Sequence, residues 1–550
     1  MLTVHRPYDV FILGSGIAGS MLAAILARNG ARTLMIDIGS HPRFAVGESP
    51  TPLFLVNLHV LAERYGVPEL RTLTDVRLCN KRIGNTFGIK KHFGFLRHEE
   101  GAEPDPAETN LIATPRAMSR APHLFRQDSD AYMFRAAAEY GCDIRQGWQV
   151  VDIDFDDEGV TVVGANDELY RARYFVDATG ARSALADRLN LRERPTRLKH
   201  HSRSLFTHMI GVAPLDDVLR HPVAERPPLP WHAGTQHHFF DGGWFWVIPF
   251  GNHPDSGNPL CSVGLTLDSR RFPRDETVAP DEEFWSYVRR FPAIARQFQD
   301  ARPVREWIAT DRLQYSATAS IGDRWCLLSH AAGFVDPLFS VGLSSTAEVI
   351  NALAWRLLAA VRDDDFSAER FRFVEQLEQA TLDYSDALVG CAFTAFSHHR
   401  LFDAVLRVWA IGSTPGTLRL FDGLVRARRA KDYRVLNELE GAKNAGLWWP
   451  GHEGYADLFD LTVEVCGRYR RGGLTGDEAA GHIMNAIQAA DYVPPLGWKD
   501  PAQRFIVPSG WNVVRLLTWA RWTAPADVRR NSRSIWRTVV FDLIRGRRSI

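Results

Sequence analysis

The sequence predicts an α/β fold in which a parallel-sheet domain carries an inserted antiparallel sheet and is followed by a helical region. A strand-like run, a glycine-rich turn and a helical run follow one another in residues 8–28. Alternating aromatic and β-branched runs lie between about residues 195 and 320, and the pattern beyond residue 365 is mostly helical. We therefore expect three domains, comprising residues 1–195 with 320–365, residues 196–319, and residues 366–550.

Composition indicates a globular protein without a charged partner. Of 550 residues, 45% are hydrophobic and 24% charged, which excludes wholesale disorder. Lys and Arg (65) balance Asp and Glu (65), so neither nucleic acid nor an anionic membrane is an expected partner. No apolar run reaches the ~18 residues of a membrane span, and the first residues lack the apolar core of a secretory signal. Six scattered cysteines without a Cys-x-x-Cys pair predict reduced thiols in a cytoplasmic protein.

The first forty residues carry the best-defined local pattern. Residues 8–13 are rich in strand formers, and Gly14-Ser15-Gly16-Ile17-Ala18-Gly19 follows directly. Residues 20–28 are helix formers closed by Asn29-Gly30, and residues 33–37 form a second buried strand. This order predicts a β-α-β unit with a parallel pair of strands.

The spacing Gly14-x-Gly16-x-x-Gly19 between a strand and a helix is typical of a dinucleotide-binding, Rossmann-like turn. Gly14 allows the tight turn, Gly16 lets the backbone approach a pyrophosphate, and Gly19 permits close helix–strand packing. The helix N-terminus offers amide donors to the phosphates. Asp37 is placed to accept hydrogen bonds from ribose hydroxyls. A glycine-rich turn without a ligand is the weaker alternative, because all the parts occur together.

The remaining elements follow from alternation and helix signals. Helices are expected at residues 53–65 and 128–140, the second capped by Asp128. Strands are expected at residues 148–155, 160–163 and 170–176, and an antiparallel set at residues 204–212, 236–240, 244–250 and 261–267. A strand at residues 324–328 and a helix at residues 344–361 complete the first domain.

Two downstream segments favour FAD over NAD as the dinucleotide. Asp177-Ala178-Thr179-Gly180 ends a strand where the chain could pass the adenosine end of a cofactor. Gly333-Phe334-Val335-Asp336-Pro337 precedes a second glycine-bearing helix start, where Asp336 could accept from a ribityl hydroxyl. Three separated segments that converge on one long cofactor indicate an FAD-binding domain. The alternative is that Asp336 only starts a helix.

In this order the motifs resemble those of flavin-dependent halogenases, within the class of GR2-type flavoprotein monooxygenases. Besides the glycine turn, the resemblance rests on residues 41–49 (His-Pro-Arg-Phe-Ala-Val-Gly-Glu-Ser), Arg126-Gln127-Asp128, Asp177-Ala178-Thr179-Gly180 and Asp336-Pro337-Leu338-Phe339-Ser340. Trp244-Phe245-Trp246-Val247-Ile248-Pro249 matches the Trp-x-Trp-x-Ile-Pro signature, which ordinary aromatic hydroxylases lack. Residues 197–204 and 310–316 resemble the branch that contains tetracycline and pyrrole halogenases.

The resemblance implies FADH2-dependent chlorination in secondary metabolism. In the family, FADH2 and O2 give a flavin C4a-hydroperoxide, chloride attacks it, and the resulting hypochlorous acid travels to a lysine beside the substrate. The implied cofactor and co-substrates are FAD, chloride and O2, with FADH2 delivered by a separate flavin reductase. The implied substrate is an electron-rich aromatic, either a phenolic polyketide such as a tetracycline or a pyrrole, free or carrier-bound.

Lys90 is the implied catalytic lysine, because Gly88-Ile89-Lys90-Lys91-His92-Phe93-Gly94-Phe95 matches the family pattern Gly-x-Lys-x-x-Phe-Gly-Phe. In the family this lysine lies in a strand, and successive strand residues face opposite sides, so Lys90 and Lys91 cannot both point inward. A reactive neutral amine near pH 7 requires desolvation. We expect Lys91 to be the solvated residue of the pair.

Trp244 and Trp246 stand two residues apart and therefore share one strand face. The resemblance implies that they, with Pro249, form a partition between the flavin and the substrate, which diverts the oxidant from hydroxylation to halide oxidation. Ordinary core packing is the open alternative.

The resemblance places the halide at the backbone amides of Val341 and Gly342, which follow the Asp-Pro-x-x-Ser motif. Phe339 departs from the Glu that tryptophan halogenases carry at this position. Phe cannot steady a developing positive charge on the ring. We therefore expect a phenol or a pyrrole as substrate and not free tryptophan.

Gly47, Glu48 and Ser49 resemble the strap that joins the flavin to the oxidant tunnel, and Arg126 is expected to approach the flavin or its pyrophosphate. A Pro-rich loop without function is the alternative for the strap. Four histidines of the expected substrate sheet are more often structural than catalytic: His201, His208, His237 and His238. Their scatter, without paired carboxylates, argues against a metal site.

Two other function classes stay open. An NADPH-dependent aromatic hydroxylase would share the fold, and a non-catalytic flavin-binding relative would share the cofactor site. No NAD(P)H site is evident in the sequence, which favours the halogenase.

Overall fold

The computed structural model describes residues 7–115, 118–166, 168–507, 510–526 and 528–529. By compactness the chain divides into two units. Unit 1 comprises Met1–Gly84, Leu124–Leu198 and Gln314–Ser385, and unit 2 comprises Asn85–His123, Lys199–Leu313 and Asp386–Ile550. The three-domain division stays a prediction, and residues 530–550 of its helical domain lie outside the described residues.

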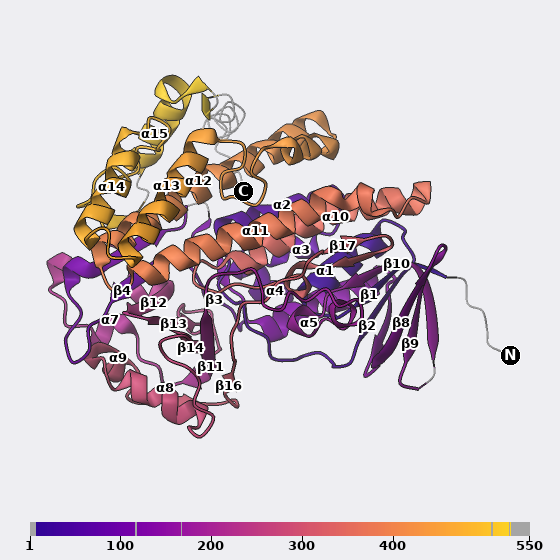
Figure 1. Cartoon of the computed structure of the whole chain (residues 1–550), viewed down its shortest axis with the longest axis horizontal. Coiled ribbons are helices and arrows are strands. Elements are labelled where there is room, and N and C mark those ends of the chain that lie inside the picture. The colour runs from indigo at the N-terminus through magenta and orange to yellow at the C-terminus, as the bar shows by residue number, and fades with distance from the viewer. Residues whose placement is uncertain (1–6, 116–117, 167, 508–509, 527, 530–550) are drawn as a thin grey trace. The chain divides into compact units, whose positions relative to one another are not determined.

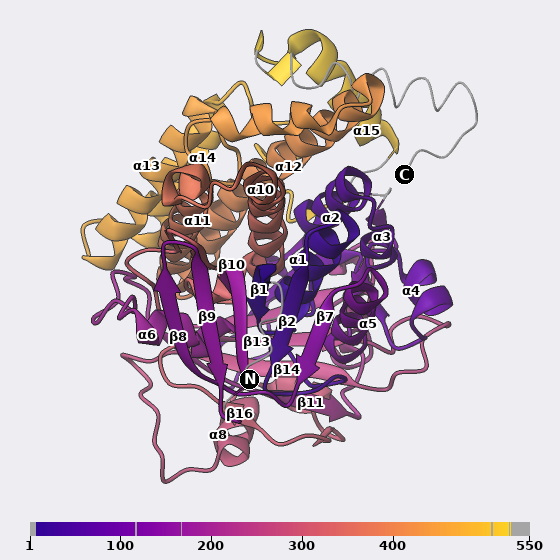
Figure 2. The ribbon, with the colours of Figure 1, turned by 90° about the vertical axis from the view of Figure 1, so that its right-hand side faces the viewer.

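Unit 1 contains the predicted parallel sheet. Its strands are β1 (Tyr8–Leu13), β2 (Thr33–Asp37), β7 (Asp143–Gln146), β8 (Val150–Asp156), β9 (Gly159–Gly164), β10 (Leu169–Asp177), β17 (Ile321–Gly322) and β18 (Trp325–Leu327). The central order is β18-β10-β1-β2-β7 with parallel pairing, while β8 and β9 add an antiparallel hairpin beside β10. Figure 2 shows β8, β9, β10, β1, β2 and β7 side by side, and Figure 1 shows the hairpin next to β10.

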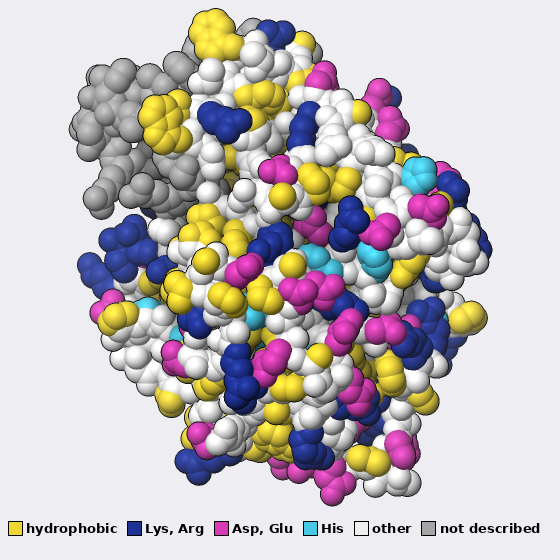
Figure 3. Space-filling model, turned by 90° about the vertical axis from the view of Figure 1, so that its left-hand side faces the viewer, with side chains coloured by type: hydrophobic (Ala, Val, Ile, Leu, Met, Phe, Trp, Pro, Cys, Tyr) yellow, Lys and Arg dark blue, Asp and Glu magenta, His cyan; other side chains and the backbone are white. Residues whose placement is uncertain are grey.

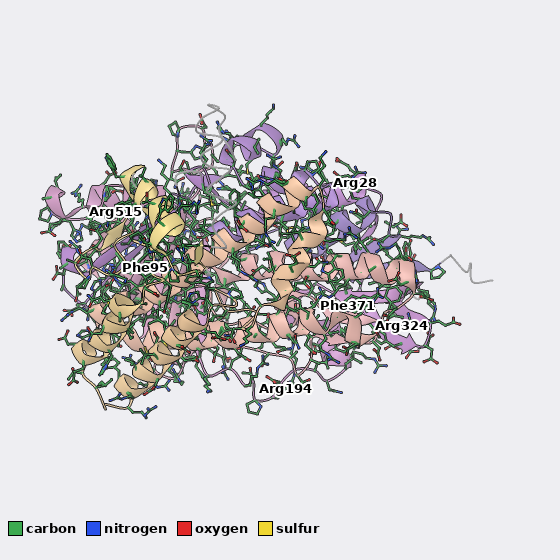
Figure 4. All side chains as sticks on the ribbon, turned by 90° about the horizontal axis from the view of Figure 1, so that it is seen from above. Arg28, Phe95, Arg194, Arg324, Phe371 and Arg515 are labelled. Carbon is green, nitrogen blue, oxygen red and sulfur yellow. The ribbon has the colours of Figure 1, made fainter. Side chains whose placement is uncertain are left out.

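The helices of unit 1 cover this sheet. They are α1 (Ile17–Arg28), α2 (Pro52–Tyr65), α3 (Glu69–Thr72), α4 (Val76–Arg82), α5 (Arg126–Glu139), α6 (Ala184–Arg188), α10 (Val341–Asp363) and the first part of α11 (Ala368–Ala395). Tyr174 of β10 packs on Phe371 of α11, which Figure 4 labels, with ring centroids 5.0 Å apart, so α11 lies against β10. Strand residues such as Phe11 and Phe175, which stack at 5.3 Å, form the core.

Unit 2 contains the predicted antiparallel sheet. Its strands are β3 (Gly88–Ile89), β4 (His92–Arg97), β5 (Thr109–Ala113), β6 (Pro122–His123), β11 (Ser202–Ile210), β12 (Thr235–Phe240), β13 (Gly243–Pro249), β14 (Cys261–Asp268), β15 (Arg302–Pro303), β16 (Ile308–Ala309) and β19 (Phe505–Ile506). The order through the large sheet is β15-β11-β14-β13-β12-β4-β5-β19. The predicted strands at 204–212, 236–240, 244–250 and 261–267 correspond to β11, β12, β13 and β14.

The helices of unit 2 confirm the helical pattern of the C-terminal part. They are α7 (Leu215–Val218), α8 (Pro280–Val288), α9 (Pro292–Gln297), α12 (His399–Ala430), α13 (Glu453–Arg470), α14 (Gly476–Ala489) and α15 (Gly510–Thr518). Phe284 of α8 packs on Phe245 of the sheet with ring centroids 5.7 Å apart, and Ile294 of α9 belongs to the same core. Acidic and basic side chains are interspersed on the face shown in Figure 3, in keeping with the balanced charge.

Two local predictions are wrong. Helix α5 begins at Arg126 and its N-cap position is Phe125, so Asp128 lies inside the first turn and does not cap the helix. Its carboxylate suits that place because the helix dipole favours negative charge there. Lys90 and Lys91 lie between β3 and β4 and not within a strand, because the pairing of β3 with β6 ends at Ile89.

Among the described residues, no helix is long and apolar enough to span a membrane. The six cysteines are buried free thiols.

Candidate active site

The turn between β1 and α1 has the geometry of a phosphate-binding turn. Gly14 has φ +102°, and a Cβ at Gly19 would lie 2.0 Å from the carbonyl oxygen of Gly14. Around Gly16, by contrast, a Cβ would meet nothing within 4 Å. Gly16 is the N-cap of α1, which has no side-chain cap, so the first amides of the helix are open to a bound group. These residues fit the pyrophosphate of a dinucleotide.

Asp37, the predicted ribose acceptor, is engaged by protein donors. Its carboxylate accepts from both terminal nitrogens of Arg43 at 2.6 Å, from the amide and hydroxyl of Ser15, and from the amide of Gly39. Burial alone would raise the pKa of Asp37, but these hydrogen bonds outweigh it and lower the pKa to about 2. Asp37 therefore fixes Ser15 and Arg43 beside the glycine turn, and its contact with a ribose stays a prediction.

The strap at residues 46–49 is held by Arg126. The guanidinium donates to the carbonyl oxygens of Val46 (2.5 Å) and Gly47 (3.3 Å), and it forms a bidentate ion pair with Asp130. Gly47 has φ +92°, and a Cβ there would lie 3.0 Å from the same guanidinium. Glu48 and Ser49 are buried. Arg126 thus positions the strap. Its contact with the cofactor stays a prediction.

The N-terminus of α10 opens on a small cavity in unit 1. Ser340, the N-cap, has φ +54° and no side-chain cap hydrogen bond, so the amides of Val341 and Gly342 begin the helix uncapped. Asp336, Val341 and Gly342 line a cavity of about 50 Å³. One Asp336 oxygen accepts from the amide of Leu338 at 3.0 Å. The structure therefore brings the predicted ribityl acceptor and the predicted halide amides to one place.

Further polar residues line this cavity, among them Ser329, His330 and Glu378. Sequence reasoning missed them. Ser329 and His330 stand only a few residues before the recognised Asp-Pro motif, and that proximity was the available signal. Glu378 lies on α11, about forty residues away in the chain, and carries no motif.

Lys90 lies in unit 2 and is completely buried, with an exposed fraction of 0%. Its ammonium nitrogen stands 3.4 Å from the centroid of the Phe93 ring. Burial lowers the pKa of Lys90 well below its ordinary value. Lys91 is only half-buried. Lys90, and not Lys91, therefore has the desolvation that a neutral, reactive amine requires.

Histidines near Lys90 are also buried and uncharged. Burial, with a smaller contribution from the neighbouring Lys90, lowers the pKa of His92 to about 4 and that of His237 to about 3. His237 contacts the carbonyl oxygen of Gly94 through Nδ1 at 2.9 Å and stacks on Phe95, which Figure 4 labels, at 4.4 Å. These contacts agree with the structural role expected for His237.

Trp244 and Trp246 lie on one face of β13, as their spacing predicts, with ring centroids 5.7 Å apart. Both are buried. Trp246 donates to the Ser262 hydroxyl at 3.2 Å and covers Gly264 of β14, where a Cβ would lie 2.1 Å from the indole. The carbonyl oxygen of Pro249 contacts His123 Nδ1 at 2.9 Å.

The predicted residues divide between the two units. Unit 1 holds the cofactor and halide candidates, which are Gly14, Gly16, Gly19, Asp37, Gly47, Glu48, Ser49, Arg126, Asp336, Val341 and Gly342, and unit 2 holds Lys90, Trp244, Trp246 and Pro249. Within the described ranges, no three His, Cys, Asp or Glu side chains are arranged to hold a metal ion.

Comparison with known proteins finds extensive similarity. The model of the tryptophan halogenase family matches residues 99–395. The tetracycline 7-halogenase of Kitasatospora aureofaciens is 50% identical over 94% of this chain and 93% of its own. The monodechloroaminopyrrolnitrin halogenase PrnC of Pseudomonas fluorescens is 42% identical over 95% of this chain and 93% of its own.

Solved structures agree with these relatives. The crystal structure of the halogenase PltM in complex with phloroglucinol and FAD is 35% identical, covers 91% of this chain and 100% of its own, and superposes with a TM-score of 0.87. The flavin-dependent brominase Bmp2 is 20% identical with a TM-score of 0.57 and shares the fold.

Proposed function

Since this chain belongs to the tryptophan halogenase family, we propose that it chlorinates an electron-rich aromatic precursor of a secondary metabolite, with a phenolic polyketide as the first candidate and a pyrrole as the second. The predicted family, enzyme class and cofactor are confirmed: the chain is a flavin-dependent halogenase that uses FAD. The observation that carries the proposal is the 50% identity to a tetracycline halogenase along nearly the whole chain.

Reduced FAD, when bound, supplies the two electrons with which O2 and chloride give hypochlorous acid and water. The α1 turn offers amides to its pyrophosphate, and Asp336 is the candidate acceptor for a ribityl hydroxyl. Val341 and Gly342 are the candidate halide donors, since uncapped helix amides suit a partly dehydrated anion.

Lys90 is the residue that we assign to the transfer of chlorine. Its complete burial favours the neutral amine. A neutral amine and hypochlorous acid form an N–Cl bond as the O–Cl bond breaks, and the amine proton leaves with hydroxide as water. The aromatic carbon then attacks chlorine, the nitrogen recovers a proton, and the ring loses one. Alternatively, the amine holds hypochlorous acid by a hydrogen bond.

Trp244 and Trp246 support this route by their bulk. Two buried indoles on one strand face form a wall that a small oxidant could pass at its edge and an aromatic substrate could not cross. Such a wall favours halide oxidation over direct hydroxylation of the substrate.

Phe339 supports the choice of substrate. Its side chain is buried, with 1% exposed, and carries no charge that could steady a positive ring. A phenol or a pyrrole stabilises its own cationic intermediate through the lone pair of oxygen or nitrogen. Free tryptophan would need help from the protein, so it fits less well. A carrier-bound form of either substrate remains an alternative.

The test is chlorination of a panel of phenols and pyrroles by the full chain with FAD, chloride, O2 and a flavin reductase, followed by mass spectrometry. We expect the two-line isotope pattern of one chlorine on a phenolic polyketide. In Lys90→Met the product should fall by at least about 100-fold, within the range that one positioned proton-transfer group contributes.

Lys91→Met is the matched control, because it makes the same substitution at the half-buried neighbouring lysine. It should retain most of the activity, and both variants should bind FAD as the wild type does. Equal losses in both variants would contradict the role of Lys90. Oxygenated products without chlorine would contradict the proposed function itself.

A further inference from the structure

A histidine, His330, lines the cavity at the N-terminus of α10, and the proposed function gives it no role. The cavity of about 50 Å³ is lined by His330 together with Val341 and Gly342. That volume accommodates a few water-sized groups and is far too small for an aromatic substrate. Water molecules or a small ion fit this volume.

His330 presents its Nε2 atom toward the first turn of α10. A Cβ at Gly342 would lie 2.8 Å from Nε2 and 3.1 Å from the adjacent ring carbon. The ring edge therefore stands directly beside the start of the helix, in space that only a glycine leaves free. Nε2 is buried and has no hydrogen-bond partner among the described residues. A buried ring nitrogen without a partner is costly, so a bound group is expected to satisfy it.

Glu378 is the second buried polar group on the cavity wall. One carboxyl oxygen accepts from the amide of Ser329 at 2.7 Å, and the carboxyl group also interacts with the side chain of Ser320. The side chain is 4% exposed. Burial raises the pKa of Glu378 to about 8, so the group is uncharged at neutral pH and does not repel an anion.

We propose that His330 is a halide-binding residue, whose Nε2–H donates to the chloride held by the amides of Val341 and Gly342. The inference deepens the proposed function and rests on its halide site. Burial, with Arg126 nearby, lowers the pKa of His330 to about 4, so the imidazole is neutral at pH 7. A neutral donor holds chloride by a hydrogen bond and leaves its charge available for attack on an oxidant.

Two substitutions of His330 distinguish the effect of its hydrogen-bond donor from the effect of its ring shape. His330→Phe retains a flat ring and removes the donor, while His330→Gln places an amide N–H at a similar reach. The holoenzyme with FAD is titrated with bromide, and the dissociation constant is read from the change in flavin absorbance. We expect affinity for bromide to fall by about 10- to 100-fold in His330→Phe, the loss of one hydrogen bond to a charged group, and to recover most of the way in His330→Gln.

The affinity for FAD is measured on the same samples by quenching of flavin fluorescence, and it should not change. Equal bromide affinity in all three proteins overturns the inference. Loss of FAD affinity with unchanged bromide affinity also overturns it, since His330 would then belong to the cofactor site. Crystals of the wild type soaked in bromide locate the ion by anomalous diffraction. If bromide binds elsewhere in an enzyme that does chlorinate its substrate, only the proposed halide site is refuted. Absence of any halogenated product refutes the proposed function instead.

Discussion

Glu378 is a single residue whose protonation links folding to pH. Its pKa is raised by burial to about 8 in the folded protein, against about 4.3 in an unfolded chain. The folded state therefore binds one more proton than the unfolded state between these values. Its contribution to stability is complete below about pH 4.3 and is lost as the pH rises through about 8.

We expect Glu378→Gln to remove this dependence. At pH 5 the variant and the wild type should unfold at similar urea concentrations. At pH 8 the variant should be the more stable by an amount on the order of a few kcal/mol, because Gln has no proton to lose. Urea unfolding followed by circular dichroism at both pH values measures it. Glu369→Gln, an exposed carboxylate of the same helix, is the control. A pH-independent difference between Glu378→Gln and the wild type would be inconsistent with a raised pKa.

At the scale of single residues, the sequence predicted which residues belong to the site better than it predicted their burial and hydrogen bonds. Lys90 was found through its neighbours, and its burial distinguishes it from Lys91, which is consistent with the choice. His330 and Glu378 could not be found, because an unsatisfied nitrogen and a raised pKa arise only when distant segments fold together. Asp37 was located correctly at the end of β2, but its saturation by Arg43 depends on a loop conformation that no spacing rule describes.

Strand β14 offers an element-scale test of the indole wall. Gly264 pairs with Trp246 of β13, and a Cβ there would penetrate the indole. Gly264→Ala should therefore displace Trp246, destabilise the fold by about 1–3 kcal/mol as overpacking does, and lower the yield of chlorinated product per FADH2 consumed. Hydrogen peroxide release should rise as chlorination falls, and FAD binding should not change.

Gly481→Ala is the matched substitution. Gly481 lies within α14, and a Cβ there would meet nothing within 4 Å. Alanine in a helix interior should raise stability by about 0.5–1 kcal/mol and leave the coupling of FADH2 to chlorination intact. Coupling unchanged in Gly264→Ala, despite a destabilised fold, would show that Trp246 is ordinary core packing.

Helices and strands with a clear hydrophobic periodicity could be predicted from the sequence, whereas short strands could not. The β1-α1-β2 unit is set by glycines whose steric roles are visible in the sequence. The segment from β3 to β4 was expected as a strand only through the family resemblance, because Gly88 and Gly94 interrupt the alternation that marks a strand. Pairing of β4 with β12, which is distant in the chain, holds it in the sheet. Helix α5 starts at Arg126 without a capping side chain, so a start inferred from Asp128 as the cap was misplaced.

For the whole molecule, the order of motifs predicted the fold class and the family, because it resembles the order in flavin-dependent halogenases. The comparisons bear out both. Substrate identity was not accessible in the same way. It depends on the shape of a chamber lined by residues from several elements, and aromatic residues in those elements also satisfy ordinary packing.

We propose that the source of electrons distinguishes this molecule from an aromatic hydroxylase. The sequence contains one Gly-x-Gly-x-x-Gly turn, at Gly14–Gly19, and FAD requires it. A hydroxylase that reduces its own flavin must also accommodate a nicotinamide. We therefore expect the purified holoenzyme to oxidise NADPH no faster with a phenol present than without it. Addition of a flavin reductase with NADH should start formation of chlorinated product. Absorbance at 340 nm and mass spectrometry of the same reactions measure both. Oxidation of NADPH that accelerates with substrate, in the absence of reductase, would assign the molecule its own reductive step and remove the need for a partner.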